Sequence, residues 1–152
     1  MPSSSPDARC PINCYVENMT DPSEFIRSIY LGDRACKSIL MDGWTAEVRV
    51  QVDLISRVRG ETWNYYNAEN LENGFIVFEG VRRIEWDANG KIPNDAFEKF
   101  TVERCVTGES EYIFRMEIAS CDEESKFTPV HIAIYADAIA LEAQNGGLRI
   151  RE

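Results

Sequence analysis

The sequence predicts a mainly β protein (α+β by strict count), built as an antiparallel β-sandwich or a partly open barrel with one N-terminal helix. Three observations support this fold class. Segments with strand-like patterns recur at spacings of about 8 to 12 residues, short turns join them, and no long helices are available for the crossovers of a parallel sheet. The chain has 152 residues, which suits one domain with its own core.

The N-terminal part divides into a tail and a helix. Residues 1–20 begin as a Ser- and Pro-rich stretch and are predicted to form a flexible tail before a single β-rich domain at residues 21–152. Asp21 is suited to cap a helix, Pro22 fits its first position, Glu24 completes a capping-box pattern, and Gly32 can end it. We expect a helix of about ten residues, which must dock on something larger because short helices are marginal alone.

The first two strands are predicted at residues 36–41 and 44–54, separated by Asp42 and Gly43. This dipeptide tolerates the positive φ angles of a tight hairpin turn. Apolar and polar residues alternate through the second segment, which predicts a strand with one buried and one solvated face. On the polar face we expect only weak cross-strand ion pairs. The residues of this polar face are Glu47, Arg49, Gln51 and Asp53.

The rest of the chain continues the β pattern. Short helical turns are plausible after Asn67, closed by Gly74, and after Asn94. Neither is long enough to set the fold. The further strands are predicted at residues 75–81, continued by 82–86, and at 100–106, 112–121, 130–136, 139–143 and 148–150.

The net charge indicates which class of partner to expect, and the cysteines and the N-terminus indicate a cellular location. Sixteen Lys and Arg against 26 Asp and Glu give a net charge of −10, which disfavours nucleic acid and anionic membrane surfaces and favours a basic protein as partner. No apolar run approaches the roughly 20 residues that span a bilayer. The five cysteines are odd in number, and the N-terminus lacks the apolar stretch of a secretory signal, so we expect reduced thiols and a cytoplasmic location.

No pattern in the chain predicts catalysis, a metal or a cofactor. His131 is the only histidine, so any Ser/His/Asp or Cys/His mechanism must use it. It lies mid-strand, out of phase with Val130 and Ile132, which favours a structural or surface role. Cys10 and Cys14 have the spacing of half a metal site, but no second pair follows. An enzyme based on carboxylates stays the third-ranked hypothesis.

Aromatic and acidic clusters are the candidate partner-binding residues. Trp63, Tyr65 and Tyr66 lie close together, and such residues either fill a core or anchor a protein interface. The acidic candidates are Glu109, Glu111, Asp122, Glu123 and Glu124. In the alternative hypothesis, a small-molecule-binding β-barrel, the interior would be lined by Trp44, Trp63 and Trp86.

Several motifs resemble those of an uncharacterised bacterial domain family. They are the opening Asp-Pro-x-Glu-Phe helix, YLGDR at residues 30–34, ISRVR at 55–59 followed by Trp63 and Tyr66, GFIVFEGV at 74–81, and GKIPND at 90–95. In size, acidity and β content the chain is also similar to small immunity proteins that neutralise bacterial toxins. The leading hypothesis is therefore a non-enzymatic, cytoplasmic protein-interaction module, with toxin neutralisation as its specific form.

Overall fold

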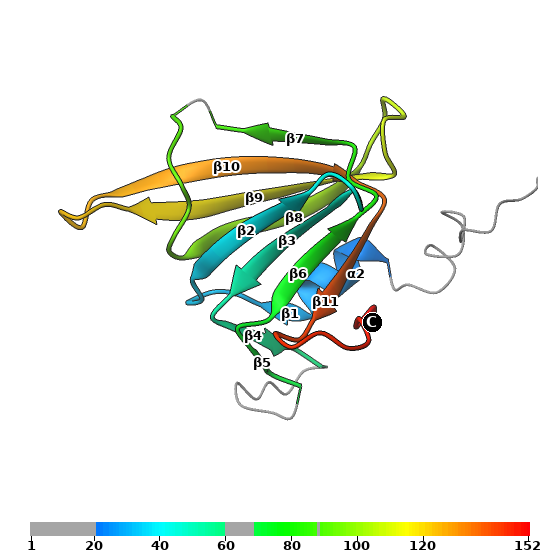
Figure 1. The fold of residues 1–152 in the computed structure, drawn as a ribbon, viewed down its shortest axis with the longest axis horizontal. Coiled ribbons are helices and arrows are strands. Elements are labelled where there is room, and N and C mark those ends of the chain that lie inside the picture. Colours follow the sequence, from blue (N-terminus) through cyan, green and yellow to red (C-terminus); the bar gives the residue numbers. More distant parts are fainter. Residues whose placement is uncertain (1–20, 60–68, 88) are drawn as a thin grey trace, which may run out of the picture.

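Two four-stranded antiparallel sheets form the body of the fold, with a small three-stranded sheet and one short helix beside them (Figure 1). The computed structural model describes residues 21–59, 69–87 and 89–152. The strand orders are β7-β10-β9-β8, β11-β6-β3-β2 and β1-β4-β5. The predicted mainly β, antiparallel fold with one N-terminal helix is confirmed, and the described strands form no closed barrel. The elements are α2 (Pro22–Arg27), β1 (Ile29–Tyr30), β2 (Cys36–Asp42), β3 (Glu47–Val52), β4 (Leu54–Arg57), β5 (Leu71–Glu72), β6 (Phe75–Glu79), β7 (Arg83–Trp86), β8 (Phe97–Arg104), β9 (Tyr112–Cys121), β10 (Phe127–Ala136) and β11 (Ala138–Glu142).

The core lies between the two large sheets, and alternate residues of their strands fill it. Val50 and Val52 of β3 are fully buried, as is Phe114 of β9. Phe78 of β6 packs against Phe114, with ring centroids 5.1 Å apart. The alternation predicted for the segment that contains β3 is confirmed, with Val48, Val50 and Val52 buried. Burial of these apolar side chains is the main force that holds the two sheets together.

The helix begins where the sequence predicts and ends earlier. Asp21 accepts a hydrogen bond from the Ser23 N–H at 2.9 Å, which is the expected cap. The expectation that the helix continues to Gly32 was wrong, because Ile29 and Tyr30 leave it to form β1 and pair with β4. Strand pairing thus overrides the helical pattern of the apolar residues.

The β2–β3 hairpin lies at the predicted place with a longer turn. Asp42 pairs with Glu47, so residues 43–46 form a four-residue turn rather than part of a strand. The Asp42 carboxylate accepts hydrogen bonds from the N–H groups of Trp44 at 3.0 Å and Thr45 at 3.2 Å. Trp44 is fully exposed, and Trp86 on edge strand β7 is 41% exposed. The expectation that these two tryptophans line an interior was wrong.

Asp53 ends β3 and sends the chain into the small sheet. Its carboxylate accepts from the N–H groups of Ala35 at 3.0 Å and Leu54 at 2.8 Å. β4 then pairs with β1 and β5, so the predicted single strand at 44–54 is two strands in different sheets. The described residues before Gly74 contain strand β5, where a helical turn was expected.

No helix follows Asn94 either. Its side chain donates to the Cys121 C=O at 3.0 Å and accepts from the Cys121 N–H at 2.7 Å. These bonds hold the segment extended along the end of β9. β8 therefore begins at Phe97, three residues before the predicted strand.

Two sharp corners pass the chain between the large sheets. Gly80 has a positive φ of 65°, which separates β6 from β7 where the sequence predicted one continuous run. A Cβ at this position would lie 2.5 Å from the Asp137 carboxylate. Asp137 is the single residue between β10 and β11, and its buried carboxylate accepts from Arg82 at 2.8 Å and from the Glu111 N–H at 3.1 Å.

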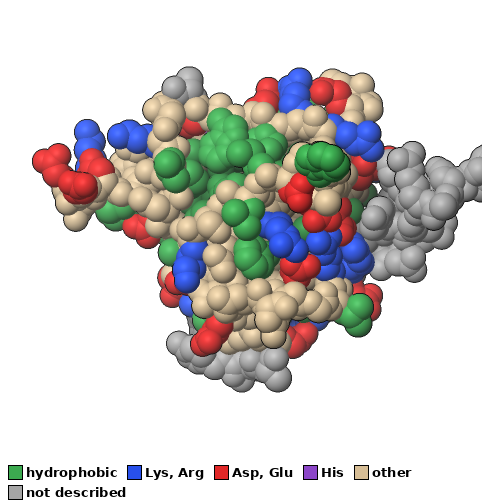
Figure 2. Space-filling model, viewed as in Figure 1, with side chains coloured by type: hydrophobic (Ala, Val, Ile, Leu, Met, Phe, Trp, Pro, Cys, Tyr) green, Lys and Arg blue, Asp and Glu red, His purple; other side chains and the backbone are tan. Residues whose placement is uncertain are grey.

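The outer face of sheet β11-β6-β3-β2 is covered by the C-terminal segment. Arg149 contacts Glu47 and Glu79 at 2.6 Å and Glu142 at 3.0 Å. Figure 2 shows the resulting interleaved acidic and basic side chains over these strands. Glu47 and Arg49, predicted as a solvated face, are thus partly buried. The predicted last strand at 148–150 is reduced to one bridge, between Ile150 and Leu141.

Candidate functional site

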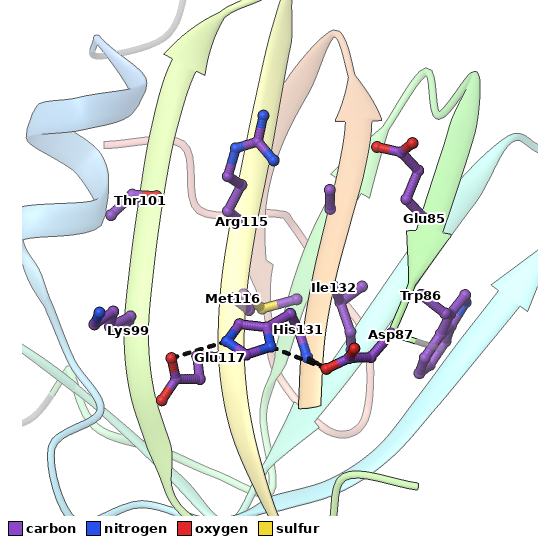
Figure 3. Close-up of a pocket in the computed structure, with 11 residues that line it drawn as sticks. Glu85, Trp86, Asp87, Lys99, Thr101, Arg115, Met116, Glu117, His131 and Ile132 are labelled. Carbon is purple, nitrogen blue, oxygen red and sulfur yellow. Dashed lines mark hydrogen bonds and ion pairs between the residues drawn. The ribbon is translucent and has the colours of Figure 1, made fainter. Parts of the chain in front are cut away.

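The outer face of sheet β7-β10-β9-β8 holds a hollow of about 470 Å³, drawn in Figure 3. The antiparallel register places its side chains in rows across the strands, because directly opposite residues share a face of the sheet. Two rows cross the hollow. The first contains Asp87, His131, Glu117 and Lys99, and the second contains Glu85, Ala133, Arg115 and Thr101.

His131 lies between two carboxylates at the centre of the first row (Figure 3). Its Nδ1 is 2.9 Å from Asp87 Oδ2, and its Nε2 is 3.1 Å from Glu117 Oε1. The hydrogen bond to Asp87, supported by that to Glu117, raises the pKa of the imidazole above its ordinary value. Only the imidazolium can donate from both nitrogens, so the protonated form satisfies both contacts.

This geometry disfavours a catalytic role for His131. A general base needs a free ring nitrogen within reach of the substrate, and both nitrogens here face carboxylates. The neighbouring groups are also engaged, since Tyr135 donates to Glu85 and Arg115 donates to Glu103, each at 2.9 Å. The row links β7, β10 and β9 as a cross-strand ladder on the surface, where the phase of His131 predicted it.

Among the described cysteines, Cys105 has a thiol with a lowered pKa, which favours the reactive thiolate. A hydrogen bond with the Thr107 hydroxyl, 3.1 Å away, is the main cause that lowers its pKa to about 7. Burial raises the pKa of Cys36 to about 11. The Cys105 N–H donates to the C=O of Glu111, which precedes β9. Glu117, the residue opposite His131, lies six residues further along the chain, or about 20 Å in an extended strand. The two residues therefore do not form a Cys/His pair.

Among the described residues no group of three or more His, Cys, Asp or Glu side chains is placed to hold a metal ion. Cys10 and Cys14 lie outside the described residues. None of the helices in the described ranges has the length and apolar character needed to cross a bilayer.

Comparison with known proteins identifies the family. The model of a family described as "Family of unknown function (DUF6258)" matches residues 19–152. The chain belongs to this family. No curated protein and no solved structure matches it. The expected membership in an uncharacterised domain family is confirmed.

The DUF6258 fold separates the acidic residues predicted to bind a partner. Glu109 and Glu111 lie before β9, where they form ion pairs with Arg83 at 3.4 Å and Arg104 at 3.1 Å. The acidic run 122–124 follows β9 at its other end, about 30 Å away along the strand. The structure therefore does not bring the two groups together. Trp63, Tyr65 and Tyr66 lie outside the described residues.

The β9–β10 turn presents an acidic and aromatic surface, which we call the acidic tip. It consists of residues 122–127 and projects beyond sheet β11-β6-β3-β2 (Figures 1 and 2). Asp122 shapes the turn by accepting hydrogen bonds from the N–H groups of Glu124 and Lys126, both at 2.9 Å. Beside these charges Phe127 is 59% exposed. Phe127 lies outside the strand predicted at residues 130–136, so the sequence pattern did not indicate it as a candidate.

Ion pairing inside the DUF6258 domain leaves the tip acidic. Nine arginines form ion pairs within the described residues, whereas no ion pair there involves Glu123 or Glu124. The tip itself carries three carboxylates, Asp122, Glu123 and Glu124, against one lysine, Lys126. The paired arginines are Arg34, Arg49, Arg59, Arg82, Arg83, Arg104, Arg115, Arg149 and Arg151.

Proposed function

We propose that this DUF6258 protein is a non-enzymatic, cytoplasmic interaction module that binds a basic protein through the acidic tip. The observation that carries the proposal is the position of Glu123 and Glu124, without ion pairs in the described part of the chain, beside exposed Phe127 at the free end of a long hairpin. Neutralisation of a cationic bacterial toxin is the specific form that we favour.

The tip combines two contributions to binding. The net charge of −10 attracts a basic partner over a Debye length of about 8 Å in physiological salt, which speeds encounter. Phe127 supplies an aromatic side chain that a complementary pocket can desolvate, as interface hot spots require. Asp122 fixes the turn before binding, so little conformational entropy is lost when the tip docks.

The proposal is tested with the basic proteins encoded next to this gene. Each is expressed with and without this protein, growth is measured, and the dissociation constant of the purified pair is determined by calorimetry. We expect one neighbour to be toxic alone and harmless in the pair. If no neighbouring protein binds or is neutralised, the proposal fails.

Charge-reversed variants then locate the binding surface. Glu123→Lys with Glu124→Lys should weaken binding at least tenfold, mainly through the association rate. The matched control, Glu24→Lys with Glu72→Lys, changes the net charge equally at exposed positions elsewhere and should have a much smaller effect. Equal losses for the two doubly substituted proteins would show that net charge alone acts and would refute the tip as the site.

The aromatic contribution has a matched control as well. Phe127→Ala should raise the dissociation rate at least tenfold, because the anchor residue is lost. Leu148→Ala removes a side chain that is 96% exposed on another part of the surface and should leave binding unchanged.

A further inference from the structure

The four edges of the two large sheets are protected to different extents. The edge of β11 is covered by Ile150, which exchanges two hydrogen bonds with Leu141 at 2.8 and 2.9 Å. α2 packs against β8, and β7 carries the charged residues Arg83 and Glu85. β2 pairs only with β3 in the described part of the chain. The Cys36 N–H at its start donates to the Asp95 C=O at 3.0 Å, but between its bulged first residues and Asp42 the strand has none of the devices that usually block further strand pairing.

The register identifies which backbone groups of β2 face outward. The Val52 N–H donates to Gly74 at 2.9 Å on the β6 side, so the backbone groups of Arg49 face β2 because successive residues of a strand alternate. Arg49 pairs with Leu40, which leaves the N–H and C=O groups of Ile39 and Met41 on the open edge. These four backbone groups are positioned to form hydrogen bonds with an additional strand beside β2.

Apolar side chains lie along the same edge. Leu40 is 49% exposed, Met41 is 60% exposed, and Trp44 at the adjoining turn is fully exposed. They line a hollow of about 620 Å³ whose charged lining residues are Asp42, Glu47 and Arg49. Figure 2 shows apolar side chains gathered over the region between β2 and β7. An exposed edge with this composition is a site for strand addition.

We infer that β2 accepts an extended segment of another protein as an added antiparallel strand. Main-chain hydrogen bonds to Ile39 and Met41 supply affinity, and alternate apolar side chains of the segment pack on the apolar side chains of the edge. The segment carries basic residues, because the edge ends at Asp42 and the whole chain has a charge of −10. The same charge disfavours a second copy of this chain as the occupant. This inference does not depend on the acidic tip or on a toxin.

The test uses the wild-type protein and a synthetic peptide, acetyl-KVRVQVK-amide, which has the alternating pattern of β3 with lysines at its ends. Before addition of peptide, the amide protons of Ile39 and Met41 should exchange with solvent at least tenfold faster than those of Ser38 and Leu40. Saturation with peptide should slow the exchange of Ile39 and Met41 at least tenfold. An absence of such protection at millimolar peptide would overturn the inference.

Methylated peptides test the predicted geometry without changing the protein. Directly opposite residues share a sheet face, so the side chains of Ile39 and Met41 lie on the same face of the sheet as those of Val50 and Val48. The valine N–H groups of the peptide should therefore point at β2. N-methylation of the valines should weaken binding at least tenfold, whereas N-methylation of the Arg and Gln residues should change it less than threefold. The reverse order, or equal effects, would refute the predicted register.

Two protein variants and one concentration series complete the test. Met41→Pro removes an outward N–H without removing a bond to β3, and should abolish peptide binding in a folded protein. Met41→Lys places a charge on the edge and should weaken binding even if the proline variant fails to fold. Protection of Ile39 and Met41 that rises with protein concentration alone would identify a second copy as the occupant and overturn our assignment. Glu123→Lys with Glu124→Lys should retain peptide binding at high salt, which separates this inference from the proposed function.

Discussion

Replacement of Arg149 by methionine tests the ionic cover over the outer face of sheet β11-β6-β3-β2. Methionine keeps an apolar stem in place of the arginine side chain and removes the guanidinium. Glu47 loses the only ion pair that it forms among the described residues, whereas Glu79 keeps Arg151 and Glu142 keeps Arg49. The variant therefore loses one pair completely and weakens two others.

The magnitude follows from burial. Removal of one partner from a buried ion pair costs about 3 to 5 kcal/mol. The side chains of Glu79 and Glu142 are 7% and 8% exposed, but each keeps a partner, and that of Glu47 is 21% exposed. We therefore expect a loss of about 2 to 3 kcal/mol in the free energy of unfolding, or roughly 4 to 12 °C in Tm for a chain of this length.

Urea denaturation at pH 7, followed by circular dichroism, measures this difference. Arg27→Met is the control, because Arg27 is exposed and forms no ion pair in the described ranges, and it should change stability by less than about 0.5 kcal/mol. A loss below about 0.5 kcal/mol for Arg149→Met would refute the reasoning, since it would place the network among weak surface pairs.

The pH dependence gives a second check on the same network. Burial alone would raise the pKa of Glu79, but hydrogen bonds from Arg151 and Arg149 outweigh it and hold the pKa below its ordinary value. A carboxyl with a lowered folded-state pKa stabilises the protein above its unfolded pKa of about 4.3, and this contribution is lost as the pH falls through the folded value. The difference between wild type and Arg149→Met should therefore be full at pH 7 and shrink below about pH 4.

Three further changes have defined outcomes. Gly80→Ala should lower the free energy of unfolding by about 2 to 3 kcal/mol in urea denaturation. The positive φ disfavours alanine by about 1 to 2 kcal/mol, and the new Cβ would clash with the Asp137 carboxylate. An unchanged free energy of unfolding would contradict this corner geometry. His131→Asn should lower the free energy of unfolding more at pH 5.5 than at pH 8.5, by less than about 1 kcal/mol. The reason is that the pKa of His131 is raised in the folded protein, so the protonated imidazole stabilises the fold below its unfolded-state pKa, and this stabilisation is lost as the pH rises through the folded-state pKa. Iodoacetamide should alkylate Cys105 with a midpoint near pH 7, and Cys36 only after unfolding, as mass spectrometry of the peptides can show.

Local patterns predicted the strands, and long-range contacts decided how they assemble. The alternation of β3 follows from its own residues and is visible in the sequence. The assignment of strands to sheets depends on single corner residues, Asp53, Gly80 and Asp137, whose effect requires knowledge of their partners. Arg149 contacts Glu47 across 102 residues of chain, and no local pattern indicates such a contact.

The candidate sites were predictable to the same limited extent. Glu123 and Glu124 stood out as a charge run, but Phe127 did not, because strand pairing rather than alternation places it at the start of β10. The sequence also placed Glu109 and Glu111 in the same functional group. Pairing along β9 separates them from the tip, and a linear pattern carries no information on that distance.

The corner at Asp137 makes β10 and β11 one bent strand that belongs to both large sheets. The β9–β10 hairpin is therefore clamped at this corner and free at the acidic tip. A substitution at the clamped end disturbs both layers, whereas the tip can exchange side chains with little cost to folding. Such a division makes the tip a suitable place to graft a foreign recognition loop.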